Sequence, residues 1–293
     1  MREALIRYTT LFGSLFLVAL MAIPVLAWRT SDRGVPAAAN FEALSPLVAW
    51  GWILLSFLAF TAISAFVSRV LNAAVALFVL GFGFCVIALA CGNVQEFVWS
   101  GGHPLMLGIE VLVLGLLVTV VSVLIFRISG GLPELVSPPD APSITSLEAL
   151  ATPRALSFLA FGFVAVAVTW VLLGSMLSGQ VLGAVFLGSW VAAAIARLSM
   201  PTVQPVLVFA GPILCGGLVQ AVLGSGIGGN LTDQLVAGGY PRLLWVMPLD
   251  WVGGSLAGSA FGLGFAKMFF EGSLVAADVD PAESDWKPVA REQ

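Results

Sequence analysis

The apolar residues of this chain lie in long runs that are separated by short polar connections. About eight runs reach roughly 20 residues, and a helix of that length crosses the roughly 30 Å hydrocarbon core of a bilayer. The runs lack the spacing of half-buried strands or half-buried helices. We therefore expect an all-α integral membrane protein with about eight transmembrane helices. They are expected near residues 8–28, 46–67, 71–91, 104–126, 155–176, 181–197, 203–223 and 243–270.

The composition supports a lipid environment. Of 293 residues, 59% are hydrophobic and 10% are charged, whereas about 25% of the residues in a soluble domain are charged. A water-soluble fold of this length needs more charged surface, so the lipid bilayer is the expected main partner. Basic residues form no patch along the chain, which argues against nucleic-acid binding.

The Lys and Arg residues of the connections indicate the orientation, because cytoplasmic loops of membrane proteins carry an excess of them. Nine lie on one side and three on the other. The larger set is Arg2, Arg7, Arg69, Arg127, Arg154, Arg197, Lys267, Lys287 and Arg291, and the smaller set is Arg29, Arg33 and Arg242. The N-terminus is therefore expected in the cytoplasm, and an even number of spans returns the C-terminus there. The expected location is a bacterial cytoplasmic (inner) membrane.

The first span allows a second interpretation. Arg2 and Arg7 precede an apolar stretch that ends Val25-Leu26-Ala27, which is the order of a signal peptide with a small-residue cleavage site. We expect the segment to be retained as a signal anchor, so that it counts as a membrane span.

A proline-rich connection divides the chain into two halves. The first transmembrane half, 1–127, and the second, 155–270, are each expected to hold four helices. The cytoplasmic linker, 128–154, is expected to be extended because of its prolines. Thr145 to Glu148 within it has the spacing of a capping box, which predicts a short interfacial helix. The acidic cytoplasmic tail, 271–293, has no periodic apolar pattern and is expected to be mobile.

The two halves show weak similarity to each other. Gly101-Gly102-His103-Pro104 enters the fourth span, and Gly238-Gly239-Tyr240-Pro241 enters the eighth. Two repeats of four spans would be parallel, with their symmetry axis along the membrane normal. Chance is the alternative explanation, because Gly and Pro are frequent at the entrances of membrane helices.

Two acidic residues within the spans are the most informative about function. Glu110 and Asp250 lie inside the fourth and eighth spans, where a carboxylate costs a few kcal/mol to insert and is covered by protein or water. His103 precedes Glu110 by about two helical turns on the same face. The two side chains would suit successive stations along a water-filled entrance, although an ordinary interfacial histidine also explains His103.

The last two spans contain many glycines and prolines. Asp250, Gly254, Gly258 and Gly262 are spaced by four and share one face, so a neighbouring backbone is expected to approach closely there. Pro248 is expected to bend the eighth span. Prolines also interrupt the seventh span, which carries Gln220 near its outer end. Interrupted helices can line a transport cavity, whereas the alternative is that these breaks serve packing alone.

Several other chemistries are disfavoured. Cys85, Cys91 and Cys215 lie in apolar runs, and with a single histidine they provide neither a disulfide framework nor a metal site. One histidine also excludes a haem ligated by two histidines of this chain. The stretch 224–229 matches a dinucleotide-binding fingerprint, but it follows a membrane helix rather than a strand. An enzymatic role is therefore disfavoured, and the sequence identifies no cofactor.

Two functions account for these features. The first is a transporter or channel for a small solute or ion, with a site near the interrupted seventh and eighth helices. It explains the acids Asp250 and Glu110, with His103 and Gln220 nearby. The alternative is a non-catalytic core subunit of a larger membrane complex, for which closely packed glycines suffice. Partners are then expected to be further copies of the chain or other membrane subunits. The sequence does not exclude pigments or quinones that neighbouring chains hold.

Overall fold

The computed structural model describes residues 2–132, 146–201 and 203–278, without the side chains of 147, 148 and 270–278. Six helices in this part of the chain are long and apolar enough to cross a membrane. They are α1 (Arg2–Ala27), α2 (Pro46–Val70), α3 (Ala73–Ala90), α5 (Pro104–Ser129), the pair α7 (Pro153–Ala160) and α8 (Gly162–Leu172), and α9 (Ser178–Ser199). The prediction of a helical membrane protein is thus confirmed.

The seventh and eighth expected spans correspond to helices of unusual length. The apolar helix α10 (Gly211–Gly226) has 16 residues and follows the 3-10 turn η2 (Val206–Phe209). The helix α12 (Pro248–Asp278) has 31 residues and follows the 3-10 turn η3 (Arg242–Trp245). The helix α10 is apolar but shorter than a full span, and α12 is not among the six helices given above.

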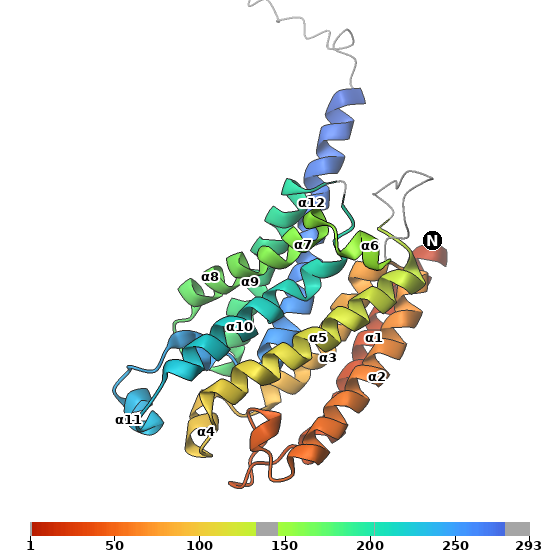
Figure 1. Cartoon of the computed structure of the whole chain (residues 1–293). Coiled ribbons are helices and arrows are strands. Elements are labelled where there is room, and N and C mark those ends of the chain that lie inside the picture. Colours follow the sequence, from red (N-terminus) through yellow and green to blue (C-terminus); the bar gives the residue numbers. More distant parts are fainter. Residues whose placement is uncertain (1, 133–145, 202, 279–293) are drawn as a thin grey trace, which may run out of the picture.

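The long helices run side by side in one bundle (Figure 1). The N-terminus and the far end of α12 lie at one end of the bundle, together with α6 (Leu147–Leu150), and we call this the inner end. At the opposite, outer end lie the short helices α4 (Val94–Trp99) and α11 (Leu231–Val236) and the 28–45 loop with its 3-10 turn η1 (Asn40–Glu42). The names follow the orientation expected from the positive charges.

Two helix pairs approach closely because glycines face a neighbouring backbone. In the pair α5 and α10, a Cβ atom on Gly108 would collide with the backbone of Ala221, and one on Gly217 would lie 2.9 Å from the amide nitrogen of Leu112. In the pair α3 and α12, a Cβ atom on Gly81 would lie 2.8 Å from the amide nitrogen of Ala257. Close backbone contact replaces the hydrophobic effect as a source of helix association in lipid.

The helix α12 also packs along α9 through the four-residue glycine row. A Cβ atom on Gly254 would lie 2.9 Å from Cβ of Val185, and one on Gly258 would collide with the carbonyl oxygen of Phe186. Gly262 faces the carbonyl oxygen of Trp190 in the same way. The glycine face of α12 is therefore turned toward protein.

The short helices α4 and α11 are alike in detail and contact each other. The side chains of Asn93 and Asn230 cap their first turns. Each helix ends two residues before a glycine with positive φ, Gly101 at 76° and Gly238 at 73°. In both, the next glycine donates its amide to a carbonyl oxygen five residues earlier, at 2.9 Å in α4 and 2.8 Å in α11.

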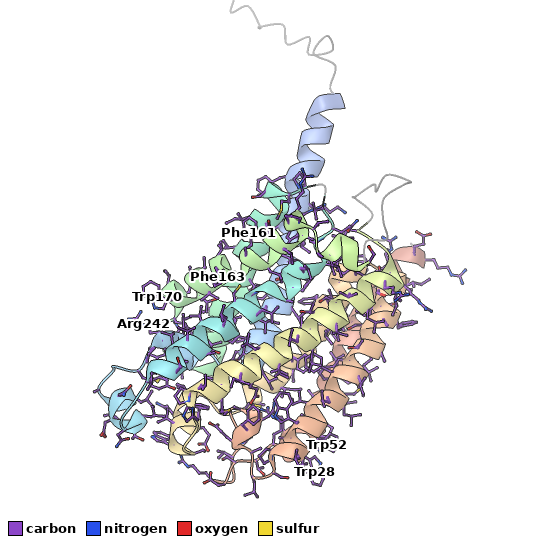
Figure 2. The ribbon with its side chains drawn as sticks, in the orientation of Figure 1. Trp28, Trp52, Phe161, Phe163, Trp170 and Arg242 are labelled. Carbon is purple, nitrogen blue, oxygen red and sulfur yellow. The ribbon has the colours of Figure 1, made fainter. Side chains whose placement is uncertain are left out.

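One expectation for the helix breaks was wrong, and another break was not foreseen. Pro248 does not bend a span, because it is the first residue of α12, where a proline needs no amide hydrogen bond. A break that the sequence did not reveal interrupts the fifth span at Phe161, which Figure 2 shows between α7 and α8. At this break a Cβ atom on Gly162 would collide with the carbonyl oxygen of Gly211, so α8 also approaches α10 closely.

We predict that Gly258→Ala destabilises the bundle by about 1–3 kcal/mol, because the added methyl group must displace the α9 backbone. Gly264 in the same helix has no atom within 4 Å of the position of a Cβ atom, so Gly264→Ala is the matched control and should leave stability unchanged or slightly raised. Thermal unfolding in one detergent measures both. Equal melting temperatures for the two variants would contradict this packing.

Candidate functional site at the outer end

The carboxylate of Glu110 is fully buried, at 0% exposure, on the first third of α5. The amide nitrogen of Asn40 donates to both of its oxygens, at 2.9 Å each. Asn40 Nδ2 donates to Oε1 at 2.8 Å, and the amide of Phe41 donates to Oε2 at 3.3 Å. A buried charge is tolerated only where such hydrogen bonds replace its hydration. Glu110 thus fastens the 28–45 loop to a membrane helix.

Arg29 supplies a fully buried positive charge to the same cluster. Its Nε donates to Asn40 Oδ1 at 2.8 Å, and its Nη1 donates to Cys91 Sγ at 2.7 Å. Asn40 therefore bridges the guanidinium and the Glu110 carboxylate through its side-chain amide. The contact to Cys91 joins the start of the loop to the end of α3, so this one arginine connects three segments.

Glu42 brings a second carboxylate to this place. Both of its oxygens are buried and lack a hydrogen-bond partner of good geometry among the described residues. Gly102 makes room for them, because a Cβ atom there would collide with Oε1 of Glu42. Burial, reinforced by the negative charge of Glu110, raises the pKa of Glu42 from 4.5 to about 9, although Ala39 and Arg29 oppose the shift. We therefore expect Glu42 to be protonated at neutral pH.

A third carboxylate, Glu96 on α4, is fully satisfied by its neighbours. Its Oε1 accepts hydrogen bonds from Ser31 Oγ at 2.8 Å and Ser100 Oγ at 3.1 Å. Its Oε2 forms an ion pair with Arg33 at 3.4 Å, and the Arg33 guanidinium lies 5.0 Å from the centre of the Trp99 ring. Glu96 thus has its own counter-charge, whereas Glu42 and Glu110 share Arg29.

The second half of the chain reaches this cluster through Tyr240. Its side chain is 2% exposed, and its hydroxyl has no hydrogen-bond partner among the described residues. Burial, together with the charge of Glu42, raises the pKa of Tyr240 above its usual value. Tyr240 packs in a hydrophobic cluster with Phe97 and Leu235, from α4 and α11. Both short helices therefore contribute to the hydrophobic packing around Tyr240, next to the carboxylates.

The other predicted polar residues hold helix ends. Gln220 Nε2 donates to the carbonyl oxygens of Leu243 and Val246, at 2.7 and 2.8 Å, and so ties α10 to η3. Asp250 lies in the first turn of α12, where its Oδ2 accepts the amide of Met247 at 3.1 Å. Oδ1 of Asp250 and Oε1 of Gln220 are buried without a partner among the described residues.

His103 does not join Glu110. It lies at the N-terminal cap of α5 with an exposed side chain and no capping hydrogen bond, whereas Glu110 faces the interior. The side chain of His103 is therefore exposed, whereas the 28–45 loop covers the side chain of Glu110. The hydrogen bond of Asp250 to Met247 stays within the start of α12, and no hydrogen bond joins Asp250 to the 28–45 loop among the described residues.

The main site residues that sequence reasoning missed are Arg29, Asn40, Glu42 and Glu96. They lie in connections, and charged residues in connections are ordinarily solvated. Arg29 lies in a connection on the predicted outer side, yet its side chain is buried. The acidic residues Glu42 and Glu96 were a usable signal of a buried polar site, because short connections outside the membrane do not need carboxylates for their fold.

The arrangement can bind a proton or a small cation. Two carboxylates that share a buried place cannot both ionise without a large energetic cost, so one retains a proton or takes up a positive ion. Within the described residues, no group of three His, Cys, Asp or Glu side chains could hold a metal ion.

No protein-family model matches the chain, and no curated protein or solved structure matches it either.

We predict that Glu42→Gln changes how stability depends on pH. The folded chain keeps a proton on Glu42 up to a pH of about 9, whereas the unfolded chain releases it above about 4.5. Unfolding thus releases this proton between these values, and the stability of the native protein falls as the pH rises through them. The variant has no carboxyl group at this position, so its stability lacks this dependence on pH. Its melting temperature should exceed the native value most at pH 9 and converge toward it near pH 5.

The control for this experiment is Asp233→Asn, which neutralises an exposed acid on α11 at the same end of the bundle. It should show the pH dependence of the native protein. Parallel melting curves for native and Glu42→Gln protein across this range would show that Glu42 is ionised at neutral pH.

Proposed function

We propose that the chain is an ion-coupled transporter or channel for a small solute or ion, in which Glu110 and Glu42 bind and release a positive charge at the outer end. The observation that carries the proposal is that Glu110, a charged residue of a membrane helix, is fully buried beside a second buried carboxylate. Ionisable groups inside membrane proteins commonly mark ion pathways and proton relays.

We further propose that the chain crosses the membrane eight times as two parallel repeats, with both termini in the cytoplasm of a bacterial cell. The likeness of α4 and α11 supports a repeat, since their capping asparagines, their glycines and the following prolines are separated by the same number of residues. The packing is also reciprocal, because α5 packs on α10 and α12 packs on α3. Each half thus places its last long helix against the third long helix of the other half.

Parallel repeats in transporters form the substrate site at their interface. In this chain the helices that cross between the halves are α5 and α12, which carry Glu110 and Asp250. We propose that Asp250, whose Oδ1 has no partner among the described residues, is the coupling carboxylate of the second half. Glu110 is its counterpart in the first half. The interrupted backbone beside Asp250 is the η3 turn, which the side chain of Gln220 holds by hydrogen bonds.

A second candidate function is a non-catalytic core subunit of a membrane complex, formed with further copies or other subunits. The polar atoms of Gln220 and Asp250 that hold helix ends favour it, because a scaffold needs such contacts and a transport site does not. The close glycine packing of α12 on α9 fits this function equally well.

The test is proton flux into liposomes that contain the purified chain and a pH-sensitive dye, driven by a potassium diffusion potential. Native protein should conduct protons or couple them to a solute. Glu110→Gln keeps the side-chain volume and removes the charge, so it should lower the flux at least tenfold, and Asp250→Asn should do the same. Asp233→Asn, which changes an exposed acid, should retain the native flux.

The outcome separates the two functions. Unchanged flux in folded Glu110→Gln and Asp250→Asn protein would contradict the roles of both carboxylates. A native chain that carries no flux and leaves the membrane only together with other subunits would instead establish the core-subunit function. Melting temperatures of the variants show that any lost flux does not come from unfolding.

A further inference from the structure

Four buried polar atoms in and around the carboxylate cluster have no hydrogen-bond partner among the described residues. They are Arg29 Nη2, the Oε1 and Oε2 atoms of Glu42, and the hydroxyl oxygen of Tyr240. The side chain of Arg29 is 0% exposed and that of Tyr240 is 2% exposed. Buried polar groups in native proteins are nearly always satisfied, either by protein or by ordered water. These atoms therefore require a partner other than the described residues.

The three side chains lie close to one another. A Cβ atom on Gly102 would collide with Oε1 of Glu42 and would lie 2.7 Å from Cε2 of Phe97, so both side chains border Gly102. Phe97 and Tyr240 belong to the same hydrophobic cluster. The charge of Arg29 acts on Glu42, and the charge of Glu42 acts on the hydroxyl of Tyr240. The unpaired atoms thus surround the carboxyl group of Glu42.

The hydrogen-bonding capacity of these atoms limits what can bind between them. A guanidinium nitrogen only donates, a carboxylate oxygen only accepts, and a phenol hydroxyl does both. The partner must therefore accept from Arg29 and donate to Glu42. A metal cation accepts no hydrogen bond and is repelled by the guanidinium, whereas an anion is repelled by the carboxylates. Water has both capacities, and buried water commonly bonds polar groups that lack a protein partner.

We propose that Arg29, Glu42 and Tyr240 bind an ordered water molecule at the outer end. The water accepts a hydrogen bond from Arg29 Nη2 and bridges a carboxyl oxygen of Glu42 to the hydroxyl of Tyr240. This site depends only on burial and hydrogen-bonding capacity, so it stands without the proposed transport function.

The bridge links the carboxylate cluster to the second half of the chain. The charged side chains that act on Glu42 are Glu110, Glu96 and Arg29, and all three belong to the first half. Tyr240 follows α11 in the second half. A movement of the second half away from the 28–45 loop would therefore break the bridge and change the hydrogen bonding of the Glu42 carboxyl group.

A structure of the native protein in lipid, at a resolution that resolves ordered water, tests the site directly. We expect a density peak within hydrogen-bond distance of Arg29 Nη2, Glu42 and the hydroxyl of Tyr240. The peak should be weaker or absent in Tyr240→Phe, which keeps the ring and removes the hydroxyl. Tyr8→Phe is the matched control, because Tyr8 is the other tyrosine of the chain and is 63% exposed on α1. It should keep the peak.

A double-mutant cycle in one detergent tests the same bridge in solution. Tyr240→Phe should lower the melting temperature by about 2–4 °C, as expected for the loss of one hydrogen bond from a large domain. Glu42→Leu removes both carboxyl oxygens, so the loss of the hydroxyl should cost clearly less in that background, because residues that share a partner are not additive. Tyr8→Phe should leave the melting temperature unchanged in both backgrounds.

Three results would overturn the proposal. The first is a direct hydrogen bond from Tyr240 to Glu42 with no density peak between them. The second is a peak that strengthens when rubidium replaces sodium, because a bound cation would then occupy the site. The third is a Tyr240→Phe protein as stable as the native chain or more stable, since a buried hydroxyl without a partner is costly and its removal is favourable.

Discussion

The outer half of the structure depends on the burial of the Glu110 carboxylate. A carboxylate on a membrane helix must be covered, and the 28–45 loop covers it with two backbone amides and the side chain of Asn40. Arg29 is positioned by the same asparagine and carries the compensating charge into the interior. Breaking one partner of such a network leaves an uncompensated buried charge, which is strongly destabilising. The loop is therefore part of the core and also of the candidate site.

Close helix packing is the complementary constraint. Glycines at the contacts of α5 with α10, of α3 with α12 and of α9 with α12 allow backbones to touch, and in lipid this contact is a main source of helix association. The same packing brings the last long helix of each half against the other half. Glu110 and Asp250 thus lie on α5 and α12, each of which packs against a long helix that is distant in the sequence, α10 and α3 respectively.

The helical membrane fold followed from sequence because apolar run length is a direct consequence of bilayer thickness. The glycine row of α12 was equally readable, since a spacing of four defines one helical face. The carboxylate cluster was only half predicted. Glu110 was found because an acid within a span is conspicuous, whereas Arg29, Asn40 and Glu42 belong to a loop whose fold back onto α5 leaves no periodic pattern. The position of Pro248 was wrongly predicted because proline is frequent both at the first residue of a helix and at a bend within one.

We infer that Glu42 holds a proton beside Glu110 at neutral pH, and infrared spectroscopy of the protein in detergent can detect that proton. A protonated carboxyl group gives a carbonyl band that a carboxylate lacks. We expect such a band in native protein at pH 7, its loss as the pH rises through about 9, and a smaller band in Glu42→Gln. A band that is identical in the native protein and in Glu42→Gln at every pH would contradict the claim.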